Sequence, residues 1–140
     1  MAKILPFEVE YDYDFQLLGI ICHLPDYRLC WTINKTLELQ MSLREDTLQS
    51  LQKDKATVIP FNVFCTVVED LHVELYLIDN INEGHRLIPE LKNIDYLFMV
   101  KGGSSSYIKH CKNALQKADH ILGVIDIPVE SLKSKEKLLF

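Results

Sequence analysis

The sequence predicts one α+β domain in two layers, with a mixed, mostly antiparallel sheet of about five or six strands and two helices on one of its faces. Three observations support this fold class. Apolar segments of strand length recur along the chain, only two segments have helical periodicity, and the strands form both a hairpin and a strand–helix–strand unit. The length of 140 residues suits a single domain over residues 1–140.

The composition is that of an ordinary folded domain. Hydrophobic residues make up 48% of the chain and charged residues 25%, whereas disordered chains are poor in apolar residues. The formal net charge of −5 works against general binding to the phosphate backbone, because such binding depends on clustered cations. The composition therefore disfavours nucleic acid as a partner.

The chain has no sequence feature of a membrane protein or an exported protein. Its apolar stretches have the length of strands, while a membrane-spanning helix needs about 20 apolar residues. Acidic residues at Glu8 and Glu10 interrupt the N-terminal region before a signal-peptide core could form. We expect a cytoplasmic protein with no membrane partner.

The four cysteines are expected to be reduced, and those at 30, 65 and 111 to be largely buried. Cys22, Cys30, Cys65 and Cys111 lie in apolar segments and form neither a CxxC pair nor a zinc-type cluster with histidine. A free cysteine behaves as a small core hydrophobe, and disulfides are rare in the cytosol. The alternative, a reactive thiol, needs a cationic neighbour.

The first strand and the first helix follow each other directly. Residues 15–22 are apolar on both alternating faces, as in a strand that is covered on both sides. A helix then opens at Pro25 and runs to about Leu39. Its apolar arc, projected at 100° per residue, contains Tyr27, Leu29, Cys30, Trp31, Ile33 and Leu37. We therefore expect Tyr27 and Trp31 in the core rather than in an aromatic stacking platform.

Asn34 is the polar exception in this helix, because it falls inside the same apolar arc. A buried amide must find hydrogen-bond partners. Two interpretations follow: Asn34 is a local structural clamp, or it belongs to a binding pocket.

The middle of the chain predicts a hairpin and a second central strand. A short edge strand is expected at 47–51. Strands at 59–68 and 71–78 follow, and the turn residues between them join the two as a hairpin. Residues 94–100 are again apolar on both faces, which predicts another strand in the middle of the sheet.

The last part of the chain predicts a crossover. A helix at 104–118 has one apolar stripe, the last strand covers 120–127, and a charged tail follows at 128–140. We expect the strands at 94–100 and 120–127 to form a right-handed parallel crossover. Two strands that are apolar on both faces need a second cover, which could be the tail, the N-terminal segment or another copy of the chain.

A Gly/Ser-rich loop precedes the second helix. Backbone N–H groups at a helix N-terminus can bind an anion, which makes this loop a candidate for phosphate. The loop lacks the GxxxxGK[ST] and GxGxxG patterns, and serine is an expected helix cap, so a plain loop with a cap is the other interpretation. The candidate residues are Gly102, Gly103, Ser104 and Ser105.

Glu90, Asp95 and Tyr96 stand close together in the sequence at the start of a strand. A carboxylate pair in a cleft could serve acid/base catalysis or a divalent ion. Equally, each carboxylate could cap backbone amides, as buried carboxylates must. Histidines show no HExxH spacing and serines no GxSxG turn, so the sequence predicts no metal, no cofactor and no standard hydrolase site.

Residues 88–96, Ile-Pro-Glu-Leu-Lys-Asn-Ile-Asp-Tyr, resemble the signature of the bacterial IPExxxVDY family, in which no activity is assigned. Ile94 stands in place of the valine, a conservative change for a strand. The similarity extends over most of the chain through Asp14-Phe15, Leu18-Gly19-Ile20, Asp26-Tyr27-Arg28-Leu29, Trp31, Asn34 and the lysine-rich tail ending in Leu138-Leu139-Phe140. The resemblance implies no catalytic residue, only that Glu90, Asp95 and Tyr96 matter together.

These observations favour a protein of unknown function that is a non-catalytic binding or assembly module, most simply a homodimer that buries one sheet face or edge. A protein partner is compatible with the same features. Two alternatives stay open: an enzyme with a non-standard acidic site near Glu90 and Asp95, and a binder of a phosphorylated small molecule at Gly102–Ser106. We further expect Asn34, Glu90 and Asp95 to form one structural polar network.

Overall fold

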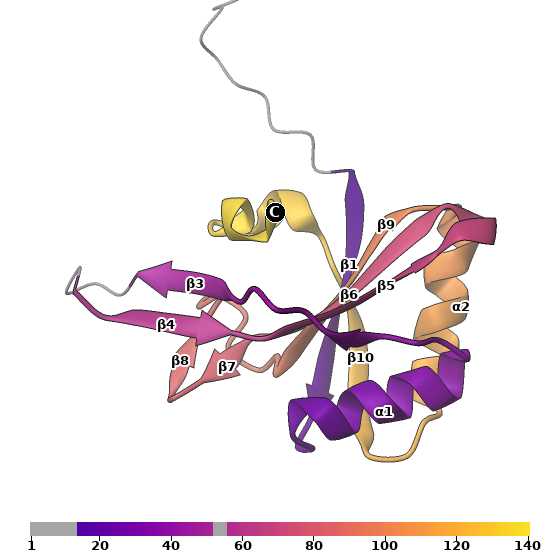
Figure 1. Ribbon diagram of the computed structural model, residues 1–140, viewed down its shortest axis with the longest axis horizontal. Helices are drawn as coiled ribbons and strands as arrows, with labels where there is room; N and C mark the ends of the chain where they lie inside the picture. Colours follow the sequence, from indigo (N-terminus) through magenta and orange to yellow (C-terminus); the bar gives the residue numbers. More distant parts are fainter. Residues whose placement is uncertain (1–13, 52–55) are drawn as a thin grey trace, which may run out of the picture.

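The computed structural model describes residues 14–51 and 56–140 and confirms an α+β fold (Figure 1). Six strands form one sheet in the order β10-β1-β9-β6-β5-β2. The strands are β1 (Phe15–Cys22), β2 (Ser42–Leu43), β5 (Val63–Val68), β6 (Val73–Asp79), β9 (Tyr96–Gly102) and β10 (Ile121–Ile127). Two hairpins outside this sheet pair β3 (Leu48–Leu51) with β4 (Val58–Phe61), and β7 (Ile81–Asn82) with β8 (His85–Arg86).

Every pairing in the six-stranded sheet is antiparallel, so the sheet is not mixed as the sequence had suggested. The correction concerns the last two strands. β9 and β10 run in the same direction, but each pairs with β1, which lies between them. The order of helices and strands along the sequence does not reveal that β1 lies between β9 and β10. The apolar character of β1 on both faces, in contrast, did predict a central position.

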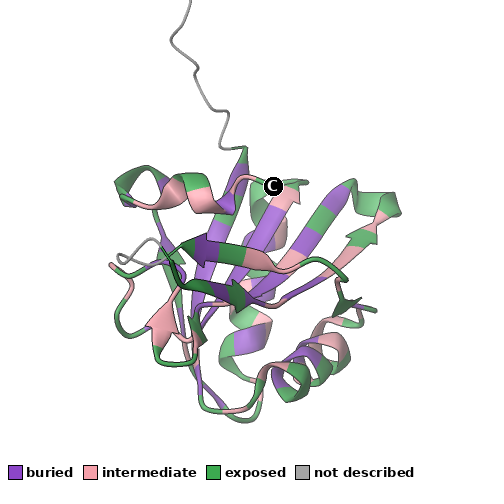
Figure 2. Ribbon diagram, turned by 60° about the vertical axis from the view of Figure 1, so that its left-hand side comes forward, coloured by how far each residue is buried: buried purple, intermediate pink, exposed green. Residues whose placement is uncertain are grey.

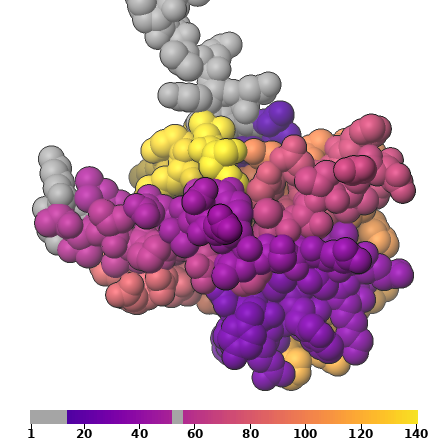
Figure 3. All heavy atoms as spheres, viewed as in Figure 1, coloured from indigo at the N-terminus to yellow at the C-terminus, as the bar shows by residue number. Residues whose placement is uncertain are grey.

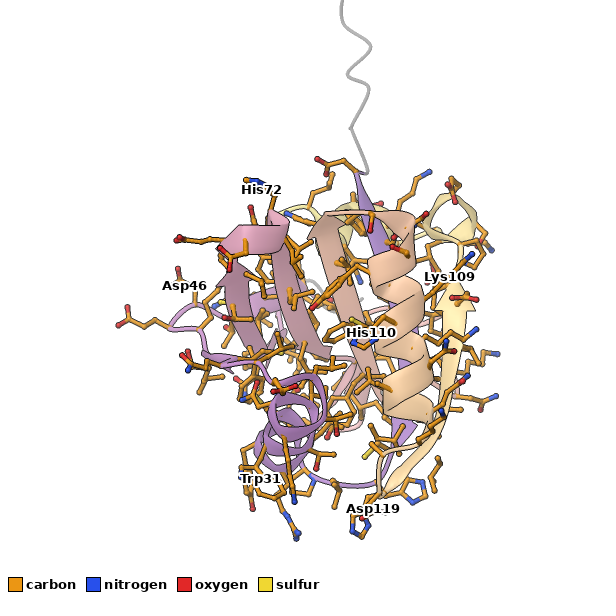
Figure 4. The ribbon with its side chains drawn as sticks, turned by 90° about the vertical axis from the view of Figure 1, so that its right-hand side faces the viewer. Trp31, Asp46, His72, Lys109, His110 and Asp119 are labelled. Atoms are coloured by element: carbon orange, nitrogen blue, oxygen red, sulfur yellow. The ribbon has the colours of Figure 1, made fainter. Side chains whose placement is uncertain are left out.

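Two helices cover one face of the sheet, as Figure 4 shows from the helical side. They are α1 (Asp26–Leu37) and α2 (Ser105–Gln116). The core between helices and sheet includes Leu29 and Ile33 of α1, Cys111 and Leu115 of α2, and Phe98 of β9. Both helices have 12 residues, which is too short to reach across a bilayer.

The chain itself covers the second face of the sheet. The C-terminal tail forms two short 3₁₀ turns, Val129–Ser131 and Lys135–Leu138, and buries Leu132 and Leu138 against this face. The β3–β4 hairpin adds Ile59 to the same core. In Figures 1 and 3 the tail lies against the segment that contains β3, and Figure 2 shows the buried bands of the sheet beneath this cover. Of the three covers considered from the sequence, the C-terminal tail is the one that packs on this face in the described part of the chain.

The middle strands follow the predicted order with one break. The 59–68 segment was expected as one strand, but it divides at Asn62 into β4 and β5. β4 pairs with β3 in a separate hairpin and is not part of the main sheet. The strand expected at 47–51 therefore exists as β3, but the edge strand of the main sheet is β2, which pairs with β5. The hairpin of β5 and β6 is confirmed, and a 3₁₀ turn at Glu69–Leu71 joins its strands.

All four thiols are free, and three of them are buried: Cys22, Cys30 and Cys111. Burial raises the pKa of Cys30 and of Cys111 to about 11, and the nearby charge of Asp26 adds to the effect at Cys30. Such thiols are poor nucleophiles at neutral pH. Cys65 is only partly buried, so the expectation of a largely buried side chain is met less fully there.

Candidate functional site

The polar residues that the sequence grouped together make separate structural contacts. Asn34 closes the turn after α1, since its Oδ1 accepts a hydrogen bond from the Met41 N–H at 2.8 Å and its Nδ2 donates to the Met41 carbonyl at 3.0 Å. Both bonds stay within one local segment. This geometry favours the structural clamp over the binding pocket.

Glu90 ties the C-terminal tail to the rest of the fold. Its carboxylate accepts hydrogen bonds from the Ser134 N–H at 2.8 Å and from the Ser134 hydroxyl at 3.1 Å. Although partial burial acts to raise the pKa of Glu90, hydrogen bonds from backbone amides and from the Ser134 hydroxyl outweigh it and lower that pKa. The carboxylate is therefore held in its charged form by the tail.

Asp95 and Tyr96 hold the end of β1 and the chain that leads into α1. An Asp95 carboxylate oxygen accepts a hydrogen bond from the Cys22 N–H at 2.9 Å, and the Tyr96 hydroxyl donates to the Leu24 carbonyl. Burial, followed by the nearby carboxylates, raises the pKa of Tyr96 above its usual range. Asn34, Glu90 and Asp95 therefore act as three separate tethers, and not as the single network expected from the sequence.

Asn80 is the polar residue that sequence reasoning missed. It is fully buried at 0% exposure. Its Oδ1 accepts a hydrogen bond from the Ile88 N–H at 2.8 Å, and its Nδ2 donates to the Ile94 carbonyl at 2.9 Å and to the Leu91 carbonyl at 3.3 Å. The signature-like segment is thus folded around one buried amide. Its turn-type neighbours indicated only a loop and gave no sign of burial.

Sequence reasoning also missed a pair of neighbouring carboxyl groups. They belong to Asp26, the first residue of α1, and Asp79, the last residue of β6. Asn62 joins them, because its Nδ2 donates to Asp26 Oδ2 at 3.0 Å and its carbonyl accepts the Asp79 N–H at 3.0 Å. Burial raises the pKa of Asp79 to about 9, with further contributions from a hydrogen bond to Asp26 and from its charge. Asp79 is therefore protonated at neutral pH.

Asp26 lies close enough to Asp79 to contribute to its raised pKa. In the part of the chain that the structure describes, no three His, Cys, Asp or Glu side chains gather as metal ligands. Asp26 and Asp79 come from distant segments, and in the sequence only Asp26 is notable, as part of the family-like Asp26-Tyr27-Arg28-Leu29. Only their position in the fold brings them together.

The glycines of the Gly/Ser loop have a packing role. Gly102 and Gly103 have φ of +81° and +75°. A Cβ at Gly102 would lie 2.5 Å from the His72 carbonyl oxygen, and one at Gly103 would lie 2.2 Å from a methyl carbon of Val73. Ser104 precedes α2, and its hydroxyl lies 2.8 Å from that of Ser106, while Ser105 is exposed. Close approach to the start of β6 accounts for the glycines without a ligand.

Tyr27 and Trp31 are on the surface, contrary to the expectation that they belong to the core. Their exposed fractions are 66% and 62%. The predicted apolar arc was too wide: Leu29 and Ile33 face the sheet, whereas Trp31 lies about 160° around the helix from Ile33. The two aromatic rings therefore form an outward stripe of α1. Figure 4 shows Trp31 at the lower end of the helical layer.

A cleft of about 490 Å³ adjoins this stripe. Arg28 and Trp31 of α1 line one side, and Lys117 and His120 from the turn between α2 and β10 line the other. A smaller hollow of about 430 Å³ is lined by Tyr27, Arg28 and Trp31. We define the α1 recognition surface as Tyr27, Arg28, Trp31, Lys35, Lys117 and His120.

Comparison with known proteins assigns no relative. No protein-family model, no curated protein and no solved structure matches the chain. The candidate site therefore rests on the geometry of this chain.

The residue types of the α1 recognition surface are compatible with binding of a partner. Trp, Tyr and Arg are the residues that most often dominate the energy of protein interfaces. Here all three lie on adjacent turns of one helix, beside a cleft. Exposed aromatic rings of this size lose solvent contact when a partner packs on them, and that loss favours binding.

Proposed function

We propose that the chain is a non-catalytic binding module that works in the cytoplasm and recognises a protein partner through the α1 recognition surface. One observation carries the proposal. Tyr27 and Trp31 are 66% and 62% exposed on a helix whose opposite side is buried in the core. Single exposed apolar side chains are common, but large aromatic side chains that stand next to each other beside a cleft are typical of interaction sites.

The contacts of the signature-like segment support a non-catalytic role. Glu90 and Asp95 are engaged with backbone N–H groups of Ser134 and Cys22. A general acid or base must instead reach a proton of the substrate. The alternative of an acidic catalytic site at these residues has less support, as has a phosphate site at Gly102–Ser106. The resemblance to the IPExxxVDY family fits this proposal, since its signature residues have structural contacts here.

Selection of ligands from a displayed peptide library tests the proposed surface. We expect the selected peptides to change the fluorescence of Trp31, which is the single tryptophan of the chain. Trp31→Ala should weaken their binding by about 30-fold, as expected for a central interface residue. Val67→Ala is the matched control, because Val67 is 60% exposed on β5. Peptides that bind Trp31→Ala as tightly as the wild type would refute the proposal.

Self-association is a second candidate function, and a different surface favours it. β10 is an edge strand of the sheet, and its Leu122 and Ile125 are 64% and 45% exposed. The single charged residue of β10, Asp126, is paired with Lys112 at 2.8 Å. Two copies could therefore meet at this edge without like-charge repulsion. Among the described residues, the tail and the β3–β4 hairpin cover the second face of the sheet, so that face gives less support for a homodimer.

A further inference from the structure

The α1 recognition surface is basic, although the chain as a whole is acidic. The formal net charge is −5. Arg28, Lys35 and Lys117 line the cleft, whereas Asp119 is the one acidic residue that does. Figure 4 shows Trp31 and Asp119 at the same end of the helical layer, where α1 and the end of α2 approach each other. A local excess of cations in an acidic molecule indicates the charge of what binds there.

These cations are not neutralised by the fold. Within residues 14–51 and 56–140, neither Arg28 nor Lys117 forms an ion pair. The ammonium group of Lys35 lies 5.1 Å from the centroid of the Trp31 ring, as in a cation–π contact. Positive charge is thus placed beside the exposed indole ring. A partner that carries carboxylates could pair with Arg28 and Lys117 while an apolar side chain packs on Trp31.

We propose that the partner of this surface is an acidic polypeptide segment with a large apolar side chain among its carboxylates. This inference rests on the proposed binding function and adds the chemistry of the ligand. The cleft of about 490 Å³ can take one or two side chains. Nucleic acid also combines negative charge with stacking, but a chain of net charge −5 opposes a long phosphate backbone. A second copy of the chain would bring like charges together at this surface.

Quenching of Trp31 fluorescence tests the local charge without any ligand. The ratio of iodide to caesium quenching should be higher for Trp31 than for free N-acetyltryptophanamide, because cations lie beside the ring and attract the anion. Lys117→Glu should reduce the preference for iodide. Lys109→Glu makes the same change in net charge on an exposed part of α2 that does not line the cleft, so it should leave the preference unchanged. A ratio in the wild type that does not exceed that of free N-acetyltryptophanamide would overturn the inference.

Defined probes test the ligand. The first probe is an acidic peptide of about twelve residues in which Asp and Glu flank a central Leu-Phe pair. In the second peptide Asn and Gln replace the acidic residues, and in the third Lys replaces them. The fourth probe is oligo-dT of similar length. We expect saturable changes in Trp31 fluorescence with the acidic peptide, at least about tenfold tighter than with the amide peptide and weaker in high salt. Lys117→Glu should lose about tenfold in affinity, and Lys109→Glu should lose none.

The outcomes separate the two proposals. Preferred binding of the neutral or basic peptide at Trp31 would keep the proposed binding function and overturn the acidic partner. Preferred binding of oligo-dT would replace the polypeptide with nucleic acid and overturn the inference as well. If no probe and no library-selected peptide responds to Trp31→Ala, both proposals fail.

Discussion

At the scale of single residues, buried polar groups determine how the ends of the strands are arranged. Asn80 and Asp95 lie at the two ends of the segment between β6 and β9, and the side chain of each bonds to backbone groups of other segments. Buried polar groups are tolerated when they are hydrogen-bonded, and they then specify one arrangement of the chain. The signature-like residues are thus best understood through what they hold in place.

Asp79 should make the stability of the fold depend on pH. Its pKa is raised from 3.8 to about 9 in the folded protein, first by burial and then by Asp26. Between these two values the folded chain holds a proton that the unfolded chain releases, so this group lowers stability as the pH rises from about 4 to about 9. Asp79→Asn should remove this dependence and stabilise the protein by about 1–3 kcal/mol at pH 8.

Denaturant unfolding at pH 5 and pH 8 measures the effect of Asp79. The difference in unfolding free energy between Asp79→Asn and the wild type should grow with pH. Asp70→Asn is the control, because Asp70 is an exposed carboxylate in the turn between β5 and β6. A difference that stays constant from pH 5 to pH 8 would contradict the assigned proton.

Asn80→Ala should destabilise the fold by at least about 1–3 kcal/mol. The change removes the acceptor of the Ile88 N–H and a donor to the Leu91 and Ile94 carbonyls in a fully buried place. Asn93→Ala is the matched control, because Asn93 is exposed. Thermal unfolding compares the two variants. Equal melting temperatures would show that the amide does not organise the loop.

At the scale of elements, helix and strand periodicity predicted most of the fold. The predicted apolar runs at 15–22 and 94–100 became β1 and β9 at the centre of the sheet, since a strand covered on both faces has few polar positions. The break at Asn62 and the insertion of β1 between β9 and β10 depend on long-range pairing, which local patterns do not encode.

The candidate site was harder to predict than the fold. Trp31 and Tyr27 are aromatic residues within the wide apolar arc of the predicted helix, so the sequence predicted that they would be buried in the core. Their exposure follows from the angular position of the sheet relative to α1, which only the packing of Leu29 and Ile33 reveals. The pairing of Asp26 with Asp79 likewise needs the tertiary fold. In contrast, the local clamp by Asn34 was open to sequence reasoning, because its partner Met41 is close in the chain.

The C-terminal tail should contribute strongly to stability, because it completes the second core. Leu138 is fully buried beneath the second face of the sheet. Leu138→Ala should lower the unfolding free energy by about 2–5 kcal/mol, as for other buried leucines. Leu122→Ala, at a side chain that is 64% exposed, should change it by less than about 0.5 kcal/mol. Similar small losses in both variants would mean that the tail is not part of the cooperative fold.

At the scale of the whole molecule, the chain buries both faces of its main sheet, each in a core of its own. Helices cover one face of the sheet, and the tail with the β3–β4 hairpin covers the other. The two edges of the sheet, unlike its faces, are not covered by a layer of the described residues. β2 makes one edge very short, and at the other edge the Gln116 amide donates to the Val124 carbonyl of β10 at 3.3 Å. Short or shielded edges limit pairing with further strands.

The expected homodimer should therefore form through side chains of β10 rather than by extension of the sheet. Leu122 and Ile125 are the exposed apolar side chains of this edge strand. Light scattering at high micromolar concentration should give twice the chain mass of 16.2 kDa. Leu122→Asp should give the mass of one chain, because a carboxylate would have to be buried in the contact.

Val67→Asp is the control for this association. Val67 is 60% exposed on β5, next to the opposite edge of the sheet, so the same change there should leave the dimer intact. A wild-type mass of one chain at high micromolar concentration would rule out the dimer. A dimer that survives Leu122→Asp but dissociates with Val67→Asp would place the interface at the other edge of the sheet. If Trp31→Ala alone dissociates it, the α1 recognition surface binds a second copy, and the acidic polypeptide partner is excluded as its main ligand.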